Sequence, residues 1–339
     1  MDNQPEEQHE VSLPPEIESE ALGTPKNNMP TIAQLSVALG ILVLIFGASY
    51  IPELAKKDPI PEPPPQEATV QEVPIIKDEF EDLSITAGAA YVWDVKNQRA
   101  LYNKNAGTQL PLASVTKLMT TLVAYESLDP DAQVRIGADA IAQEGDSNLA
   151  EGQTFSMQEL ANLTLVTSSN DGAYALAAAA GHAVAPSADP ASAFIDAMNA
   201  KAESLGLSQS FFANPTGLDI DGTTSGSYGS ARDMAFLMEY LVLKRPDILE
   251  ETREAVSTVH NQQGAVYTAT NTNEVVGRIP GILGSKTGFT DLAGGNLVIA
   301  YDAGLNRPII ISVLGSTREG RFSDIIKLVE ATERTLSTE

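Results

Sequence analysis

Hydrophobic and polar residues follow three distinct patterns along the chain. Residues 31–51 are uncharged and mainly apolar, whereas residues 89–105 and 296–315 each place apolar runs on both sides of a short polar turn. Apolar residues that recur every three to four positions fill much of the sequence between these two segments. Runs around a turn predict antiparallel strand pairs, and the three-to-four repeat predicts helices. The helices are expected at 114–127, 157–167, 171–182, 190–205, 231–244 and 321–336.

The order of these elements indicates a single globular domain that extends from residue 81 to residue 339. Strands come first, a helical segment follows, and further strands and a closing helix complete the chain. This order is typical of an α/β domain built on an antiparallel sheet. No internal repeat interrupts it.

The first 80 residues divide into three parts with different compositions. Residues 1–30 are acidic and rich in proline, and such a segment buries too little apolar surface to fold, so we expect a disordered tail. Residues 31–52 are expected to be a transmembrane anchor, because a helix of residues 31–51 spans roughly 32 Å, about the hydrocarbon thickness of a bilayer. Residues 53–80 hold five prolines between positions 59 and 65, which predicts an extended linker.

A cleaved signal peptide and a buried core helix are the two alternatives for the apolar span. The leader of a signal peptide is short and basic, whereas this leader is long and acidic, which favours a retained anchor. Lys26 precedes the span and Lys56 and Lys57 follow it. The positive-inside rule therefore gives only a weak signal, and it favours a cytoplasmic position for the large domain.

Charge and composition exclude several classes of function. The formal net charge is −24 and the isoelectric point is about 4.4, so the chain would repel a phosphate backbone and no nucleic-acid partner is expected. The chain has no cysteine, and its three histidines, His9, His182 and His260, are far apart in the sequence. We therefore expect no metal, no other cofactor and no Ser–His pair.

The stretch LPLASVTKLMTTLVAYE, residues 110–126, places Ser114 and Lys117 three positions apart at the start of a predicted helix. Residues three apart are neighbours on one helix face, and the free N–H groups of the first turn favour negative charge. A lysine can act as a base only if burial or a nearby cation lowers its pKa. Taken alone, the pair is better explained as a capping serine and a solvated lysine.

Two further motifs follow in the chain. LTLVTSSNDGAYALAAAAG contains Ser-Ser-Asn at 168–170, and GILGSKTGFTDLAGGNLVIA contains Lys-Thr-Gly at 286–288. By themselves, the first is typical of a helix cap and the second of an edge strand followed by a turn glycine. The order S-x-x-K, S-x-N, K-T-G, however, is the signature set of penicillin-recognising serine enzymes.

From residue 84 to 337 the chain resembles the low-molecular-mass penicillin-binding proteins, which are serine D-alanyl-D-alanine carboxypeptidases. The segments ASVTKLMT, SSNDGAYALA, ANPTGLD, SARDMA and KTGFTDLAGGNLV carry the resemblance. It implies an α/β fold in which an antiparallel sheet flanked by helices lies beside a mainly helical subdomain. It also implies that the chain trims peptidoglycan stem peptides ending in D-Ala-D-Ala through an acyl-enzyme, and that β-lactams inhibit it. Because that substrate lies in the cell wall, we expect a single-pass membrane protein with its catalytic domain on the extracytoplasmic side.

The resemblance implies a role for each residue of the motifs. Ser114 would be the nucleophile, Lys117 its base, and Ser168 the relay that passes a proton to the leaving amine. The residues expected to bind substrate are Asn170 at its amide, Lys286 as a positive charge, Thr287 and Arg321 at its terminal carboxylate, Gly288 where it approaches the strand, and Phe289, whose N–H joins that of Ser114 in the oxyanion hole.

Three alternatives share these motifs. A D,D-endopeptidase that cuts cross-links uses the same site. A class A β-lactamase needs a glutamate to activate the deacylating water, and residues 211–222 contain none. A penicillin-binding sensor or wall-anchoring module without catalysis would not require the intact set, which consists of Ser114, Lys117, Ser168, Asn170 and Lys286. The chain ends soon after its last predicted helix, so no second β domain and no C-terminal amphipathic anchor are expected.

Overall fold

The computed structural model describes residues 79–145, 148–187 and 189–339. The predicted acidic tail, the apolar span and nearly all of the proline-rich linker lie outside these residues. Within the described ranges, no helix is both long and apolar enough to cross a bilayer.

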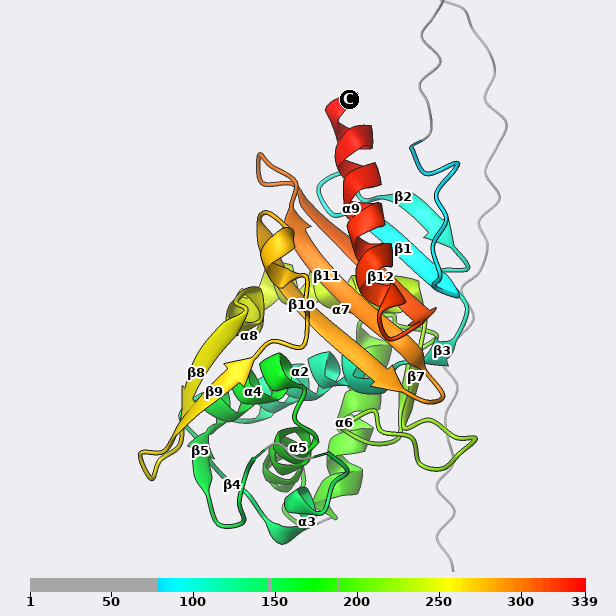
Figure 1. Ribbon diagram of the computed structural model, residues 1–339. Coiled ribbons are helices and arrows are strands. Elements are labelled where there is room, and N and C mark those ends of the chain that lie inside the picture. Colours follow the sequence, from blue (N-terminus) through cyan, green and yellow to red (C-terminus); the bar gives the residue numbers. More distant parts are fainter. Residues whose placement is uncertain (1–78, 146–147, 188) are drawn as a thin grey trace, which may run out of the picture. The chain divides into compact units, whose positions relative to one another are not determined.

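A five-stranded antiparallel sheet forms the centre of the described domain (Figure 1). The strand order is β10-β11-β12-β1-β2, so the last long strands of the chain pair with the first two. Both strand pairs predicted from the hydrophobic pattern, 89–105 and 296–315, are confirmed. The strands are β1 Ala89–Asp94, β2 Arg99–Lys104, β10 Ile282–Thr290, β11 Gly294–Asp302 and β12 Pro308–Ser316.

Helices cover both faces of this sheet, which explains why its inner strands are apolar at nearly every position. Successive residues of a strand point to opposite faces. Ile309 and Ile311 of β12 accordingly pack in the core beneath α9 (Gly320–Ser337), whereas Ile310 packs in the core shared with α7 (Ala231–Lys244). The predicted closing helix and the predicted helix 231–244 are both confirmed.

A mainly helical region lies beside the sheet and shares the core on the α7 side (Figure 1). Three of its helices begin at a residue whose side chain accepts a backbone N–H, namely Ser156, Ser169 and Asp189. The predicted helices 157–167, 171–182 and 190–205 agree with the observed ones to within two residues at nearly every end. The helices are α2 Lys117–Ser127, α3 Ala138–Ile141, α4 Met157–Thr167, α5 Asn170–Val184 and α6 Pro190–Ser204.

The predicted helix 114–127 is wrong at its beginning. Ala113–Thr116 forms a 3-10 turn, η1, and the α-helix starts only at Lys117. Ala113 has a φ of 48°, in the left-handed region, which breaks the regular helical path immediately before Ser114. Ser114 therefore lies in a tight turn that leads into the helix.

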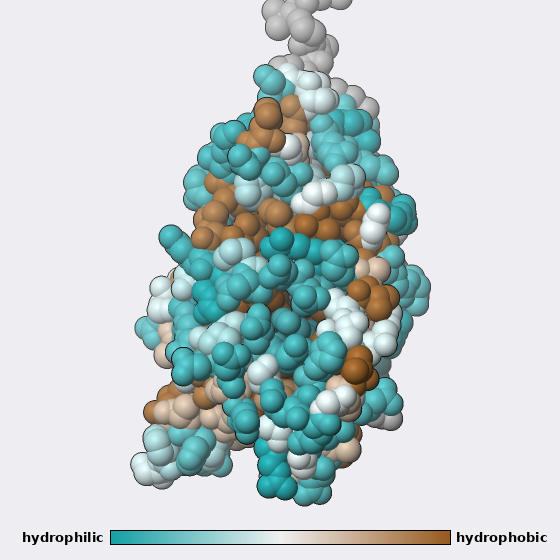
Figure 2. All heavy atoms as spheres, turned by 90° about the vertical axis from the view of Figure 1, so that its left-hand side faces the viewer, coloured by the Kyte–Doolittle hydropathy of each residue, from teal (hydrophilic) through white to brown (hydrophobic). Residues whose placement is uncertain are grey.

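The hairpin of β8 (Val256–His260) and β9 (Val266–Thr270) was not predicted. Val259 and Ala269 are buried on the face that packs against α4, while Val256 and Val266 are 56% and 63% exposed. Burial alternates along β8, but Val256 and Val266 are apolar at exposed positions and Ser257 is polar at a buried one. The sequence therefore lacks the apolar–polar alternation that predicts a strand. The face of the domain with this hairpin, on the left in Figure 1, is mainly hydrophilic and has hydrophobic side chains in smaller groups (Figure 2).

Shorter elements complete the described domain. Strands β3, β7 and β6 form a small sheet, and β4 pairs with β5. These remaining elements are β3 Leu110–Pro111, β4 Gln133–Arg135, β5 Thr154–Ser156, β6 Phe211–Phe212, β7 Ser227–Gly229, α8 Pro246–Leu249, η2 Glu250–Arg253 and η3 Val276–Arg278.

Candidate active site

The turn that contains Ser114 is held against the central sheet. Asn296 of β11 donates its side-chain N–H groups to the carbonyl oxygens of Pro111 and Leu112, each at 3.0 Å. Gly288 of β10 passes so close that a Cβ atom there would lie 2.8 Å from Leu112 O. Real side chains do not tolerate such a contact with backbone, so a glycine at this position lets β10 lie directly beside the turn of Ser114.

Lys117 is completely buried and lies next to Ser114. Its Nζ is 2.7 Å from Ser114 Oγ, 2.7 Å from Asn170 Oδ1 and 2.8 Å from Thr216 O. Burial, and then the positive charge of Lys286, lower the pKa of Lys117 well below its ordinary value. Asn170 Oδ1 and Thr216 O can only accept hydrogen bonds, so they occupy the two N–H groups of a neutral amine. The lone pair of that amine is then left for the hydroxyl of Ser114.

The S-x-N motif forms a sharp turn between two helices. Ser168 ends α4 with a φ of 64°, in the left-handed region. Ser169 caps α5 by accepting the N–H of Gly172 at 2.9 Å. Asn170 is the first residue of α5 and also donates to Glu144 O at 2.6 Å. The turn therefore directs the first and third side chains of the motif toward the site and uses the second to start a helix.

Lys286 is the second buried lysine of the site and is 1% exposed. Its Nζ donates to Ser168 Oγ and to Thr287 O, both at 2.9 Å. Burial, followed by the charge of Arg321, lowers the pKa of Lys286 to about 7. This lysine therefore titrates close to neutral pH, and any nearby anion would favour its protonated form.

The carboxylate-binding residues predicted on β10 and α9 lie around the same strand. Thr287 Oγ1 is 2.6 Å from Thr272 Oγ1. Arg321 is 7% exposed, and its Nη1 donates to Gly288 O at 2.6 Å, while its Nε has no partner among the described residues. Arg321 thus packs against the strand that carries the Lys-Thr-Gly motif. Its predicted contact with a substrate carboxylate stays a prediction.

Phe289 follows Gly288 and is fixed on two sides. The guanidinium of Arg318 lies 3.6 Å from the centre of its ring. Next to Phe289, the side chain of Asp219 accepts from Thr290 Oγ1 at 3.0 Å and from Leu292 N at 3.3 Å. These contacts hold the end of β10, which carries the N–H of Phe289. The role of this N–H in an oxyanion hole, which would require rigidity, stays a prediction.

Two features of the site were not assigned from sequence. The sequence assigns no role to the segment ANPTGLD. In the structure, Asn214 Oδ1 accepts from the N–H groups of Thr216 and Gly217 and shapes the loop whose carbonyl reaches Lys117. The Asn-Pro-Thr-Gly order of this loop is an ordinary turn signal that would have located it. Thr272 has no comparable signal, because it reaches Thr287 only through the path of the chain after β9.

The family described as D-alanyl-D-alanine carboxypeptidase, Peptidase_S11, matches residues 76–318, and the chain belongs to this family. The chain is 31% identical to the D-alanyl-D-alanine carboxypeptidase DacF of Bacillus subtilis (strain 168), over 74% of this chain and 62% of that relative, so it spans less than two thirds of DacF. It is also 31% identical to a D-alanyl-D-alanine endopeptidase of Escherichia coli (strain K12), over 72% of this chain and 76% of the relative.

The fold is similar to that of Penicillin-Binding Protein D2 from Listeria monocytogenes in its ampicillin-bound form. The TM-score is 0.61 with 31% sequence identity, over 74% of this chain and 98% of that one. The predicted family is therefore confirmed, and so is the antiparallel sheet with flanking helices.

Proposed function

We propose that this chain is a serine carboxypeptidase that removes the terminal D-alanine from peptidoglycan stem peptides and is acylated by β-lactams. The observation that carries the proposal is the contact of 2.7 Å between Ser114 Oγ and the buried Nζ of Lys117, whose pKa is lowered. The name of the B. subtilis relative and the ampicillin bound to the Listeria protein support the same assignment.

Acylation begins when neutral Lys117 takes the proton of Ser114. The Ser114 oxygen then forms a bond to the carbonyl carbon of the penultimate D-alanine, and the N–H groups of Ser114 and Phe289 stabilise the resulting oxyanion. When the C–N bond breaks, the proton that Lys117 took from Ser114 passes through Ser168 to the leaving nitrogen, and Lys117 is neutral again. Free D-alanine departs and the shortened peptide remains as an ester on Ser114.

Deacylation returns the enzyme to its starting state. A water molecule attacks the ester carbonyl, and Lys117 accepts one of its protons. The C–O bond to Ser114 breaks, the serine oxygen regains a proton from Lys117, and the shortened peptide leaves with a new carboxylate. The balance of the whole cycle is the hydrolysis of one peptide bond.

Substrate is held from two sides, by Asn170 and by strand β10. Asn170 binds the amide of the penultimate residue, and the extended peptide lies along β10 where Gly288 allows close approach. Its terminal carboxylate lies near Thr287, Lys286 and Arg321. Since an anion raises the pKa of an adjacent lysine, bound substrate keeps Lys286 protonated even above pH 7.

A D,D-endopeptidase is the second candidate, and the endopeptidase name of the E. coli relative favours it. A class A β-lactamase fits less well. Residues 211–222 contain two aspartates and no glutamate, and Asp219 accepts hydrogen bonds at both carboxylate oxygens, from Thr290 at the end of β10 and from Leu292 in the turn after it.

The cellular position of the enzyme follows from its substrate. We propose a single-pass membrane protein, anchored through residues 31–51, with the catalytic domain on the extracytoplasmic side, because stem peptides are present there. Protease added to spheroplasts should remove the large domain from the membrane. Protection of that domain would overturn this topology.

The assignment is tested with the purified full-length chain. Intact-mass analysis after incubation with benzylpenicillin should show a single adduct that is absent from Ser114→Ala, and a pentapeptide ending in D-Ala-D-Ala should release D-alanine. An adduct that persists in Ser114→Ala would show that another residue is the nucleophile.

A further inference from the structure

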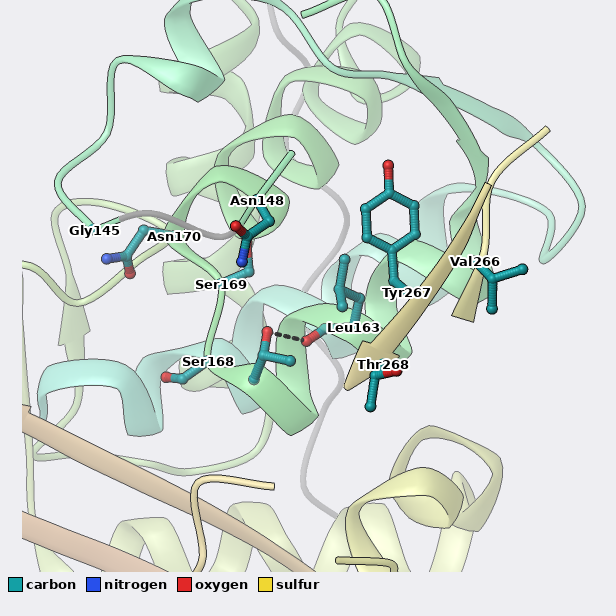
Figure 3. Close-up of a pocket in the computed structure, with 10 residues that line it drawn as sticks. Gly145, Asn148, Leu163, Ser168, Ser169, Asn170, Val266, Tyr267 and Thr268 are labelled. Carbon is teal, nitrogen blue, oxygen red and sulfur yellow. Dashed lines mark hydrogen bonds between the residues drawn. The ribbon is translucent and has the colours of Figure 1, made fainter. Parts of the chain in front are cut away.

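A cavity of about 440 Å³ lies beside the S-x-N turn and is not used in the mechanism above. In Figure 3 one wall is formed by Ser168, Ser169 and Asn170, and strand β9 forms the opposite wall. Leu163 of α4 lies between them. Ser168 therefore connects the cavity with the catalytic site, because it lines the cavity and its hydroxyl contacts Lys286.

The cavity runs along the edge of β9, where the strand has no neighbouring strand. Val266, Tyr267 and Thr268 all line it, although successive side chains of a strand point to opposite faces. Three consecutive residues can share one cavity only if the cavity follows the strand's edge. Within the described part of the chain, β9 pairs with β8 alone, so this edge is unpaired.

The hydrogen bonds of the hairpin determine which main-chain groups face the cavity. Asn271 N donates to Ala255 O, and bonded pairs alternate with unbonded pairs along an antiparallel ladder. Counting back along the register, Tyr267 is bonded to β8, whereas Val266 and Thr268 are not. The N–H and C=O groups of Val266 and Thr268 thus point away from β8 and toward the cavity. Among the described residues, neither makes a main-chain hydrogen bond to any other segment.

The lining of the cavity fits the backbone of a peptide. None of the described residues that form its walls is charged; the lining consists of hydroxyl, amide and apolar side chains. An unpaired edge recognises an extended peptide through main-chain hydrogen bonds. The hairpin is also fixed in place, because the ring of Tyr267 packs 5.4 Å from that of Phe155.

The position of β9 relates the cavity to one end of the substrate. Two residues after β9, Thr272 donates its N–H to Val166 O and places its hydroxyl 2.6 Å from that of Thr287. In the proposed mechanism Thr287 holds the carboxylate of the leaving residue and Ser168 protonates its nitrogen. The chain that leaves β9 therefore connects the strand that lines the cavity with the residues proposed to hold the leaving side of the scissile bond.

We propose that the edge of β9 binds the leaving half of a D,D-cross-linked stem peptide as an added strand. This inference rests on the proposed function and extends it from release of free D-alanine to cleavage of cross-links. A free D-alanine is too short to reach the cavity, whereas a leaving amine that belongs to a second stem peptide continues past Ser168 and Thr272 onto β9. The subsite thus contributes to substrate binding only when the leaving group is a peptide.

The test uses the full-length protein and two synthetic substrates with the same acyl half. One substrate releases D-alanine, and the other releases a second stem peptide from a cross-link. Thr268→Pro removes an N–H that faces the cavity but takes no part in the bonds to β8, a position where an edge strand accepts proline. We expect kcat/KM for the cross-linked substrate to fall by about five- to tenfold, the usual effect of one lost hydrogen bond. Release of D-alanine should change by less than about twofold.

Thr258→Pro is the matched control, because Thr258 is the cross-strand partner of Thr268 and its N–H points to the outer edge of β8. It should leave both substrates unaffected. A second measurement needs no variant: methylation of the amide nitrogens in the leaving peptide should lower kcat/KM for the cross-linked substrate by a similar factor.

Two results would overturn the subsite. One is an equal loss on both substrates in Thr268→Pro, or no loss on either together with no effect of methylation. The other is an unaltered protein that releases D-alanine and leaves the cross-link intact. By contrast, absence of both cleavage reactions and of penicillin acylation at Ser114 would refute the proposed function itself.

Discussion

Lys117 and Lys286 are both buried in the same site, yet they come from different parts of the fold and have different partners. Lys117 begins helix α2 and contacts a hydroxyl and two oxygens that can only accept. Lys286 lies in the middle of strand β10 and contacts Ser168 Oγ and a carbonyl of its own strand. The pKa of Lys117 is lowered well below its ordinary value, and that of Lys286 is lowered to about 7.

In the proposed mechanism, the difference between the two lysines gives one site both a base and a cation from the same residue type. Burial lowers the pKa of both lysines, and Lys286 adds its charge to the effect on Lys117. The lowered pKa of Lys117 favours its neutral form, and its Nζ lies 2.7 Å from Ser114 Oγ. Lys286 remains close to its titration point, so that a bound carboxylate decides its charge.

Lys117→Arg replaces the proposed neutral amine at the head of α2 by a guanidinium, which stays protonated and cannot act as the base. Acylation by benzylpenicillin should slow by about 10²–10⁴-fold, the range for loss of a general base. Stopped-flow or mass-resolved acylation rates measure this effect, with the melting temperature expected to stay near that of the unaltered protein. Lys244→Arg, at an exposed position, is the control. A normal rate in Lys117→Arg would make Lys117 structural.

Gly288→Ala should separate the strand of Lys286 from the turn of Ser114. The added Cβ would lie 2.8 Å from Leu112 O and 3.1 Å from Ser114 N, so β10 must shift and with it the N–H of Phe289. Loss of one oxyanion donor lowers turnover by about 10²–10³-fold, and we expect a loss of acylation rate in this range. At Gly277 an added Cβ meets no atom within 4 Å, so Gly277→Ala should acylate normally.

Lys286→Arg should remove a pH dependence that belongs to substrate binding alone. In the free enzyme Lys286 loses its charge as pH rises through about 7, so KM for a D-Ala-D-Ala peptide should increase above that pH. An arginine stays charged, and its KM should be flat between pH 6 and 9, although kcat is reduced. Steady-state kinetics across this range give the result. A KM that rises equally in both proteins would place the titrating group elsewhere.

The same lysine should make the stability of the fold depend on pH in the opposite sense. A rise in pH above about 7 should weaken substrate binding but stabilise the folded state. The pKa of Lys286 is about 7 when folded and near 10.5 when unfolded, so the unfolded state binds more protons between these values. The free energy of unfolding should therefore rise with pH over this window, by up to about 1.4 kcal/mol per pH unit for one lysine. In Lys286→Met that slope should be smaller by about 1 kcal/mol per pH unit. Urea unfolding at pH 7, 8 and 9 compares the two proteins, and identical slopes would contradict the assignment.

Much of the fold was predictable because its signals are local. The apolar runs of 89–105 and 296–315 gave the strand pairs, and the repeats after residue 157 gave helices α4 to α7 with nearly correct ends. The start of α2 was not predictable in this way. The 3-10 turn at Ala113–Thr116 depends on the close passage of β10, which is about 170 residues further along the chain.

The sequence by itself also determined which side chains to expect in the site, since three short motifs in a fixed order name Ser114, Lys117, Ser168, Asn170 and Lys286. It did not determine what surrounds them. The carbonyl that completes the environment of Lys117 belongs to Thr216, 99 residues away, and a carbonyl is present in every residue type. The edge of β9 is a property of the backbone for the same reason. Only the tertiary structure decided these contacts, because the role of a main-chain group depends on where the fold places it and not on its residue type.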